Sequence, residues 1–213
     1  MCIRDRNRSR TYVNKILNKI SGEHYKNYKI NLIKRHKENI EIFYGEKNEF
    51  FIYDKVVIAT HADEALSILE KPTNEEKNLL SNFKYKNNLA VIHTDKNQMP
   101  RNKKAWSAWN AKLSKNVREN SSITYWLNLL QNLKIDEDIF LSLNPFDYIE
   151  EEKILNKVTF THPYYDKLAL ENQTRLKKIQ NVNNTLFCGS YFGYGFHEDG
   201  ITSAIDMLKS FHD

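Results

Sequence analysis

Hydrophobic residues recur along the chain with two periodicities. Some segments have the helical repeat and others alternate apolar and polar residues, which together predict mixed helix and sheet. Residues 9–20 carry apolar side chains at helical spacing, and Ser21-Gly22 ends that segment. The turn sequence at residues 45–48 predicts a hairpin between the two strands that flank it. Short strand-like runs occupy residues 28–33, 39–44 and 49–53.

A continuous apolar run, KVVIAT at residues 55–60, is typical of a parallel strand covered on both faces. It precedes a predicted helix at residues 61–69. A second helix is predicted at residues 74–83, because Thr73 and Glu76 have the spacing of a capping box at its start. The inward positions of the first helix are Ala62, Ala65, Leu66 and Leu69.

Strand-like pieces dominate residues 87–145, where LAVIHT, AWSAWN, SITYWL and IFLSLN are separated by polar turns and carry all three tryptophans. This pattern predicts a twisted antiparallel sheet, with residues 153–161 as its last strand or a return crossing. The expected organisation is therefore a second lobe at residues 85–162, inserted into a first lobe formed by residues 9–84 and 163–213.

The last part of the chain predicts a helix, a strand and another helix. The first helix is expected at residues 163–180. Its buried face is predicted to carry Leu168, Ala169, Leu176 and Ile179. Residues 185–209, TLFCGSYFGYGFHEDGITSAIDMLK, then predict a short strand, a glycine-rich loop and an amphipathic helix.

Four of the six glycines of the chain lie in this last stretch, at Gly189, Gly193, Gly195 and Gly200. Glycines between a strand and a helix N-terminus allow close backbone approach, which favours contact with an anion such as a phosphate. No Lys or Arg occurs from Ile179 to Leu208, so main-chain N–H groups would have to hold such an anion. An ordinary tight loop between strand and helix is the alternative.

The composition favours a globular protein and argues against a nucleic-acid-binding or membrane-spanning one. A hydrophobic content of 40% indicates a globular fold. The formal net charge of +5 does not favour nucleic-acid binding, because the lysines are spread beside Asn and Glu rather than gathered in one stripe. The sequence also has no apolar run of about 18 residues and no signal peptide, so no transmembrane segment is predicted and the cytoplasm is the expected location.

Two isolated cysteines, Cys2 and Cys188, fit a reducing compartment. Cys188 lies within an apolar strand and is expected to be a buried, inert thiol. The opening MCIRDR resembles translated adapter sequence, so residues 1–8 are treated as non-native and left out of the fold prediction.

Two segments resemble the flavin-containing amine oxidase superfamily, namely KVVIATHADEAL and TLFCGSYFGYGFHEDGITSAI. With SRTYV, AVIHTD, MPRNKKAWSAWN and TYWLNLLQNL, they resemble a bacterial subgroup of NAD/FAD-binding oxidoreductases related to protoporphyrinogen oxidase-like and phytoene desaturase-like enzymes. The resemblance implies an α/β fold with a partial Rossmann-like FAD-binding lobe and an inserted, mainly antiparallel β substrate lobe. The family opens with G-x-G-x-x-G, which this sequence lacks. The chain is therefore expected to be the C-terminal part of such an enzyme.

The same resemblance implies which residues would contact FAD. The end of the mid-chain strand, the end of the late strand and the start of the last helix are the matching positions. They are Ala59, Thr60, Gly189, Ser190, Glu198, Asp199, Gly200, Ile201 and Thr202. For the last three, main-chain groups at the helix N-terminus are the expected contacts.

Aromatic residues and one histidine are candidates for contact with a small organic, apolar substrate, although lobe packing would give the same pattern. They are Tyr191, Tyr194, Phe196, His197, Trp109 and Trp126. The acidic pair Glu198-Asp199 is expected to act as a helix cap rather than to tune a catalytic His197. No metal site is predicted, because the histidines lack ligand spacing.

Removal of a hydride from a C–N or C–C bond is the activity that the resemblance implies. No catalytic side chain is assigned, since in such enzymes the flavin supplies the chemistry. Two alternatives stay open: a non-catalytic binding domain that keeps the architecture without flavin, and, less favoured, a basic nucleic-acid-binding protein.

Overall fold

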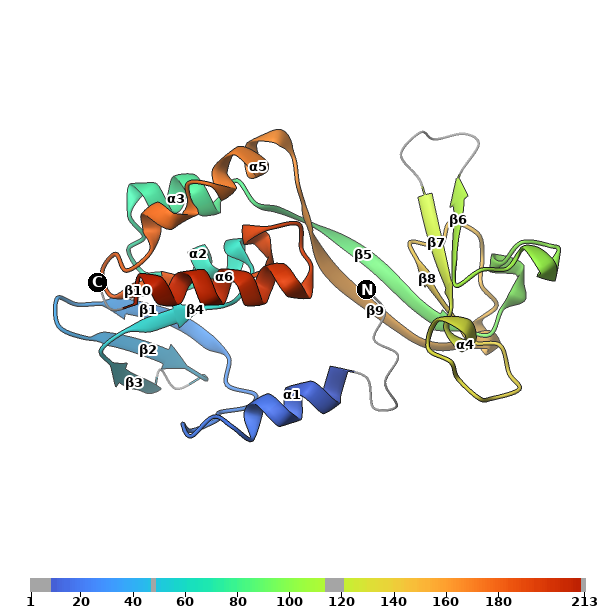
Figure 1. Cartoon of the computed structure of the whole chain (residues 1–213), viewed down its shortest axis with the longest axis horizontal. Helices are drawn as coiled ribbons and strands as arrows, with labels where there is room; N and C mark the ends of the chain where they lie inside the picture. Colours follow the sequence, from blue (N-terminus) through green and yellow to red (C-terminus); the bar gives the residue numbers. More distant parts are fainter. Residues whose placement is uncertain (1–8, 47–48, 114–120, 212–213) are drawn as a thin grey trace. The chain divides into compact units, whose positions relative to one another are not determined.

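A computed structural model describes residues 9–46, 49–113 and 121–211. The chain forms two compact units (Figure 1). Unit 1 contains Met1–Glu23 and Asn87–His162, and unit 2 contains His24–Lys86 and Pro163–Asp213. The mixture of helix and sheet predicted from the sequence is confirmed. Cys2 and residues 47–48, half of the predicted hairpin turn at residues 45–48, lie outside the described residues.

Unit 2 contains two small sheets. The first is antiparallel, in the order β1-β2-β3, with β1 at Ile30–Arg35, β2 at Ile40–Tyr44 and β3 at Glu49–Tyr53. The second is a parallel pair formed by β4 at Val56–Ile58 and β10 at Thr185–Phe187, in the register Leu186↔Val57. The hairpin and the parallel character of the KVVIAT strand are therefore both confirmed.

Helical segments pack around these sheets (Figure 1). They are α2 at Ala62–Ile68, α3 at Asn74–Leu80, α5 at Lys167–Gln173, the 3₁₀ segments η4 at Leu176–Ile179 and η5 at Ser190–Phe192, and α6 at His197–Lys209. The predicted capping box at the start of α3 is confirmed, since the Thr73 hydroxyl accepts from Glu76 N and Thr73 N donates to the Glu76 carboxylate.

Unit 2 has its main core where β1, β4 and β10 meet the helices. Ile33, Ile58, Leu79, Leu176 and Phe187 are among its buried members. A smaller cluster of Leu186, Cys188 and Met207 lies between β10 and α6. The successive residues Leu186 and Phe187 of β10 thus point into different clusters, because neighbouring side chains of a strand leave on opposite faces.

Unit 1 is built on an antiparallel sheet of five strands in the order β6-β7-β8-β5-β9. The strands are β5 at Lys84–His93, β6 at Trp109–Leu113, β7 at Ser121–Trp126, β8 at Phe140–Leu143 and β9 at Ile154–Tyr164. Its helical pieces are α1 at Ser9–Leu17, η1 at Lys96–Gln98, η2 at Lys103–Ala105, α4 at Leu127–Leu130 and η3 at Glu151–Lys153. The predicted antiparallel sheet is confirmed, and β5 and β9 both run across the boundary between the units.

A buried polar network ties three neighbouring strands of this sheet together. His93 Nε2 lies 2.8 Å from Ser142 Oγ, which lies 2.7 Å from Thr124 Oγ1. His93 Nδ1 accepts a hydrogen bond from Asp95 N, so Nε2 carries the proton and donates it to Ser142. Because this histidine cannot also act as a base toward Ser142, the network joins strands rather than activating a nucleophile.

Three predictions about unit 2 were wrong in detail. The helix expected at residues 163–180 begins only at Lys167, because β9 continues through Pro163, and it is interrupted between α5 and η4. Leu168, predicted to be buried, is 47% exposed, whereas Ala169, Leu176 and Ile179 are buried. The KVVIAT strand is not covered on both faces, since Val57 is 40% exposed.

Candidate functional site

The carboxyl ends of the parallel strands β4 and β10 meet at one edge of unit 2, where loops usually carry ligand contacts in sheets of this kind. Cys188 N donates to Ile58 O at 3.1 Å, and this bond holds the two strand ends together. A Cβ on Gly189 would lie 3.6 Å from the carbonyl oxygen of Thr60. The structure therefore brings the segments Ala59-Thr60 and Gly189-Ser190 side by side, as the proposed site requires.

Helix α6 is fastened to this strand end through Ser203. Gly189 N donates to Ser203 Oγ at 2.9 Å, and Ser203 Oγ donates to Gly200 O at 2.7 Å. Ser203 is buried, and sequence reasoning did not single it out. A small polar residue on the buried side of an amphipathic helix was the only signal that could have found it.

Gly189 and Gly200 differ in what an added side chain would meet. A Cβ on Gly189, which has φ of 155°, would lie 2.8 Å from the Tyr191 ring, so Gly189 makes room for packing within the protein. A Cβ on Gly200 would meet only Ser190 N, at 3.9 Å. A side chain at position 200 would thus make an ordinary van der Waals contact with the Ser190 main chain, so crowding does not require a glycine there.

Asp199 caps the N-terminus of α6, as the acidic pair predicted. Its Oδ2 accepts from Tyr194 N at 3.0 Å and from Phe196 N at 2.8 Å. A Cβ on Gly193 would lie within 2.3 Å of this carboxylate, which explains the glycine there. The Asp199 carboxylate is thus engaged by its own loop, while Glu198 is exposed.

The expected main-chain contacts of Gly200, Ile201 and Thr202 need a correction. Helix α6 begins at His197, three residues earlier than Gly200. Gly200 N already donates to Phe196 O at 3.2 Å, and the amides of Ile201 and Thr202 lie deeper in the helix. The N–H groups at the start of α6 are those of residues 197–199, so these are the donors that an anion could meet.

Tyr191 is a core residue rather than part of a substrate wall. It is buried against Phe83 and Phe192, with ring centroids 5.2 and 4.9 Å apart. Burial raises the pKa of its phenol, and within the described residues its hydroxyl has no hydrogen-bond partner. Tyr194, Phe196 and His197 are exposed, so a substrate role for them stays a prediction.

Trp109 and Trp126 of unit 1 lie on opposite faces of the sheet. Trp109 pairs with Tyr125 across β6 and β7, and their rings lie 4.9 Å apart. Trp126 is the next residue along β7 and therefore points the other way, against Trp106 and Phe140 of the unit 1 interior. The two tryptophans cannot form one substrate wall.

Tyr85 is a second residue that sequence reasoning missed. Its hydroxyl accepts from Ala62 N at 2.8 Å at the start of α2, and its ring stacks on His61 at 4.4 Å. Burial raises the pKa of Tyr85 to about 12, so the phenol stays protonated. A lone tyrosine in a strand gave no sign of this role, because the contact depends on how β5 and α2 meet in space.

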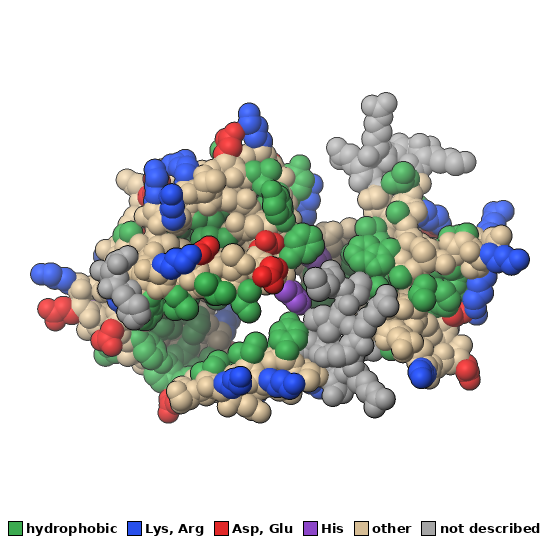
Figure 2. Space-filling view, in the orientation of Figure 1, with side chains coloured by type: hydrophobic (Ala, Val, Ile, Leu, Met, Phe, Trp, Pro, Cys, Tyr) green, Lys and Arg blue, Asp and Glu red, His purple; other side chains and the backbone are tan. Residues whose placement is uncertain are grey.

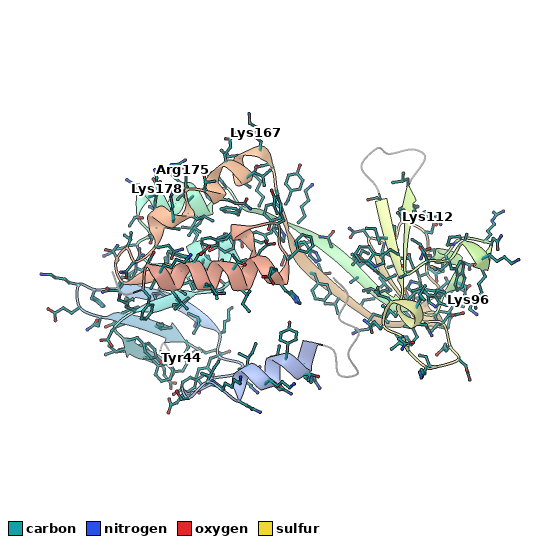
Figure 3. The ribbon with its side chains drawn as sticks, in the orientation of Figure 1. Tyr44, Lys96, Lys112, Lys167, Arg175 and Lys178 are labelled. Atoms are coloured by element: carbon teal, nitrogen blue, oxygen red, sulfur yellow. The ribbon has the colours of Figure 1, made fainter. Side chains whose placement is uncertain are left out.

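Side chains around the strand ends carry little positive charge. Arg175 and Lys178 lie on the η4 side of unit 2 (Figure 3), and Arg175 binds Glu75 at 3.2 Å. Cys188 is buried, and burial raises the pKa of its thiol. Among the residues that the structure describes, no group of His, Cys, Asp or Glu is arranged to hold a metal ion.

Comparisons with known proteins show what fold this is. No family profile matches the sequence, and no curated protein matches it. Solved structures do match. A CLA-producing fatty acid isomerase from P. acnes superposes with a TM-score of 0.66 at 14% identity, over 97% of this chain and 52% of that chain. A candidate protoporphyrinogen oxidase from Exiguobacterium sp. 255-15 gives 0.66 at 9% identity, over 95% and 50%.

Cyclohexylamine oxidase from Brevibacterium oxydans IH-35A gives a TM-score of 0.54 at 11% identity, over 87% of this chain and 49% of that chain. These neighbours are members of the flavin amine oxidase superfamily, so the fold resemblance expected from the sequence is confirmed. The chain spans about half the length of the solved proteins it matches. In the described part of the chain, no helix is both long and apolar enough to cross a bilayer.

Proposed function

We propose that this chain is the C-terminal part of an FAD-dependent oxidoreductase that removes a hydride from a C–N or C–C bond of a small organic substrate. One observation carries the proposal. The fold of flavin amine oxidase superfamily members recurs over almost the whole chain, and Thr60, Gly189 and Ser190 meet at the ends of its parallel strands. At 9–14% identity the likeness concerns the fold, so the activity is inferred.

The residues at the strand ends suit one flank of a flavin site. Gly200 has no side chain to keep a planar or phosphate-bearing group away from the main chain beside Ser190. The first-turn N–H groups of α6 carry positive partial charge, which favours a negative group near the helix N-terminus. FAD, when bound, would supply the hydride-accepting chemistry. The chain's own part would be to position the cofactor edge and to exclude water.

A phosphate cradle is missing from this half. The sequence contains no G-x-G-x-x-G, and no Lys or Arg lies between Ile179 and Leu208. The proposal therefore assigns the main dinucleotide contacts to the other half of the fold. Exposed aromatic residues Tyr194 and Phe196 beside the strand ends favour an apolar substrate over a small polar amine.

Flavin retention by the assembled protein tests this function. The chain is co-expressed with the polypeptide encoded directly upstream of residue 9, and the purified product is examined for flavin absorbance and shifted flavin fluorescence. Retained FAD that is reduced by an organic donor supports the oxidoreductase. A folded, assembled product without FAD would instead support the non-catalytic binding domain.

Retention on heparin addresses the nucleic-acid alternative. A basic nucleic-acid-binding protein releases counterions on binding, so its retention falls steeply with salt. The proposal predicts weak retention, because the basic side chains are scattered and several are paired with carboxylates, such as Lys84 with Asp166 and Arg175 with Glu75.

A further inference from the structure

The loop between β10 and α6 is anchored by packing only in its first part. Tyr191 and Phe192 pack into the unit 2 core, whereas Tyr194 and Phe196 are 68% and 63% exposed. Hydrophobic, acidic and histidine side chains lie on the surface near the start of α6 in the space-filling view (Figure 2). Beyond Phe192 the course of the loop is therefore set by hydrogen bonds to its main chain.

Two side chains at the ends of α5 hold three carbonyl groups of this loop. Gln173, the last residue of α5, donates from Nε2 to Tyr191 O at 3.2 Å and also to Gly193 O. Only the amino end of a glutamine side chain can donate, so its two carbonyl neighbours fix the orientation of this amide. Tyr165, just before α5, donates from its hydroxyl to Ser190 O at 3.4 Å. Burial raises the pKa of Tyr165 to about 12, so the hydroxyl keeps the proton that it donates.

These bonds leave the start of the loop with free donors and engaged acceptors. Ser190 O also accepts from Gly193 N and Gly195 N, at 3.1 Å each. Within the described residues, the main-chain N–H groups of Ser190 and Tyr191 donate to no other group. A Cβ on Gly200 would lie 3.9 Å from Ser190 N, so this donor lies beside the first turn of α6.

A cleft of about 330 Å³ lies between the α5–η4 side of unit 2 and α6, and Gln173, Gly193 and Asp199 are among the residues that line it. The peptide groups that Gln173 holds therefore have space to turn once its side chain is lost, and a glycine tolerates either orientation. A peptide that turns over exchanges the places of its N–H and its C=O. Carbonyl oxygens would then lie where donors lie now.

We propose that Gln173 is a positioning residue for cofactor binding: it holds the Tyr191 and Gly193 carbonyls on the α5 side, so that the loop offers N–H groups to a negative group of the cofactor. Main-chain N–H groups favour such a group and carbonyl oxygens repel it. Gln173 acts through the main chain and does not itself contact the cofactor. This inference rests on the proposed function, because it assigns the loop to the flavin site.

Gln180 is a matched control in the same unit. It is half-buried, as Gln173 is, and its amide also makes two hydrogen bonds to the main chain. Gln180 Oε1 accepts from Phe187 N at 2.9 Å, and Gln180 Nε2 donates to Phe187 O at 2.8 Å. These bonds lie on β10, which β4 also holds in place. Replacing either glutamine with leucine removes two hydrogen bonds, but only Gln173→Leu releases the loop.

Amide hydrogen exchange without FAD tests whether Gln173 fixes the loop. The amides of Gly193 and Gly195, which donate to Ser190 O, should exchange at least about tenfold faster in Gln173→Leu than in the wild type. In Gln180→Leu they should exchange as in the wild type. The urea midpoints of the two variants should fall by similar amounts, because each variant loses two hydrogen bonds.

FAD affinity and the midpoint potential of the bound flavin test the consequence for the site. Both are measured on the chain co-expressed with the polypeptide encoded directly upstream of residue 9. Gln173→Leu should bind FAD about tenfold more weakly than Gln180→Leu, the equivalent of one or two hydrogen bonds. Its potential should be more negative, because the reduced cofactor carries more negative charge. Gln173→Glu, which keeps the size of the side chain but cannot donate as a carboxylate, should act in the same direction.

Equal FAD affinity and equal potential in Gln173→Leu and Gln180→Leu would overturn the role of Gln173, because a merely structural glutamine lowers stability without separating the two variants. Unchanged exchange of the Gly193 and Gly195 amides in Gln173→Leu would overturn it as well. Failure of the oxidoreductase proposal looks different. A wild-type assembly that takes up no FAD removes both proposals, whereas FAD retained equally by all variants refutes the role of Gln173 alone.

Discussion

The ion pair between Arg35 and Glu76 allows a quantitative test of the unit 2 core. Arg35 Nη1 lies 2.6 Å from Glu76 Oε1 and Nη2 lies 2.9 Å from Oε2, and the two side chains are 5% and 0% exposed. Arg35 also donates to Lys71 O, and Glu76 accepts from Thr73 N. The pair thus fastens β1 to the start of α3, 41 positions further along the chain.

Removing one partner should cost far more than removing both. Arg35→Met leaves a buried carboxylate without its counter-charge, and Glu76→Leu leaves a buried guanidinium, each at a cost of about 3–5 kcal/mol. The double variant loses both charges but leaves only Lys71 O and Thr73 N unpaired, at about 1–3 kcal/mol in all. The double-mutant cycle should therefore show a coupling energy of at least about 3 kcal/mol.

Urea-dependent hydrogen exchange of amides in β1 and α3 is the suitable assay, because all three tryptophans lie in unit 1 and their fluorescence would report on the other unit. Arg35→Lys and Glu76→Gln serve as milder variants if the single replacements do not fold. Single and double variants with additive losses would refute the reasoning, since additivity means that the two side chains do not depend on each other in the folded state.

Three further predictions concern single residues. Gly193→Ala should destabilise unit 2 by about 1–3 kcal/mol in denaturant titration, because its Cβ would overlap the Asp199 carboxylate, and an unchanged midpoint would contradict the capping geometry. Burial lowers the pKa of His93 from 6.5 to about 4, so the unfolded state binds a proton that the folded state does not. Stability of unit 1 should fall by about 3 kcal/mol from pH 7 to pH 4 relative to His93→Gln, and parallel pH profiles would contradict this. Because burial raises its thiol pKa, Cys188 should resist alkylation until urea unfolds the chain, and rapid labelling of its peptide in the native protein would contradict its burial.

Local signals in the sequence predicted the elements that depend on neighbouring residues. The capping box of Thr73 and Glu76 and the hairpin of β2 and β3 are set by contacts within a few positions, and both were found. The KVVIAT run predicted a parallel strand, and β4 is one. The exposure of Val57 was missed, because an apolar run shows that a strand suits burial but not whether anything covers it.

Long-range contacts decided the features that the sequence did not predict. The aromatic loop after β10 suggested a substrate wall, but η5 turns Tyr191 back into the core against Phe83. Leu168 fits a helical repeat, yet the helix starts four residues later than expected and its register with the core changes. Trp109 and Trp126 were grouped by composition, whereas strand alternation separates them onto two faces.

The candidate site was predicted through family resemblance rather than through its own chemistry. The strand ends at Thr60 and Gly189 do meet, which short apolar runs and glycine spacing alone could not establish. Ser203 and Tyr85, which fasten the surrounding helices, were missed, because a serine in a helix and a tyrosine in a strand have no sequence pattern that marks such contacts.

A crystal structure of the chain assembled with its upstream segment and loaded with FAD is the most direct test of the central claim. The account predicts FAD in van der Waals contact with Thr60, with Gly189 and Ser190, and with the first turn of α6 at residues 197–200. FAD bound away from the ends of β4 and β10, or a folded assembly that takes up no FAD at saturating cofactor, would contradict it.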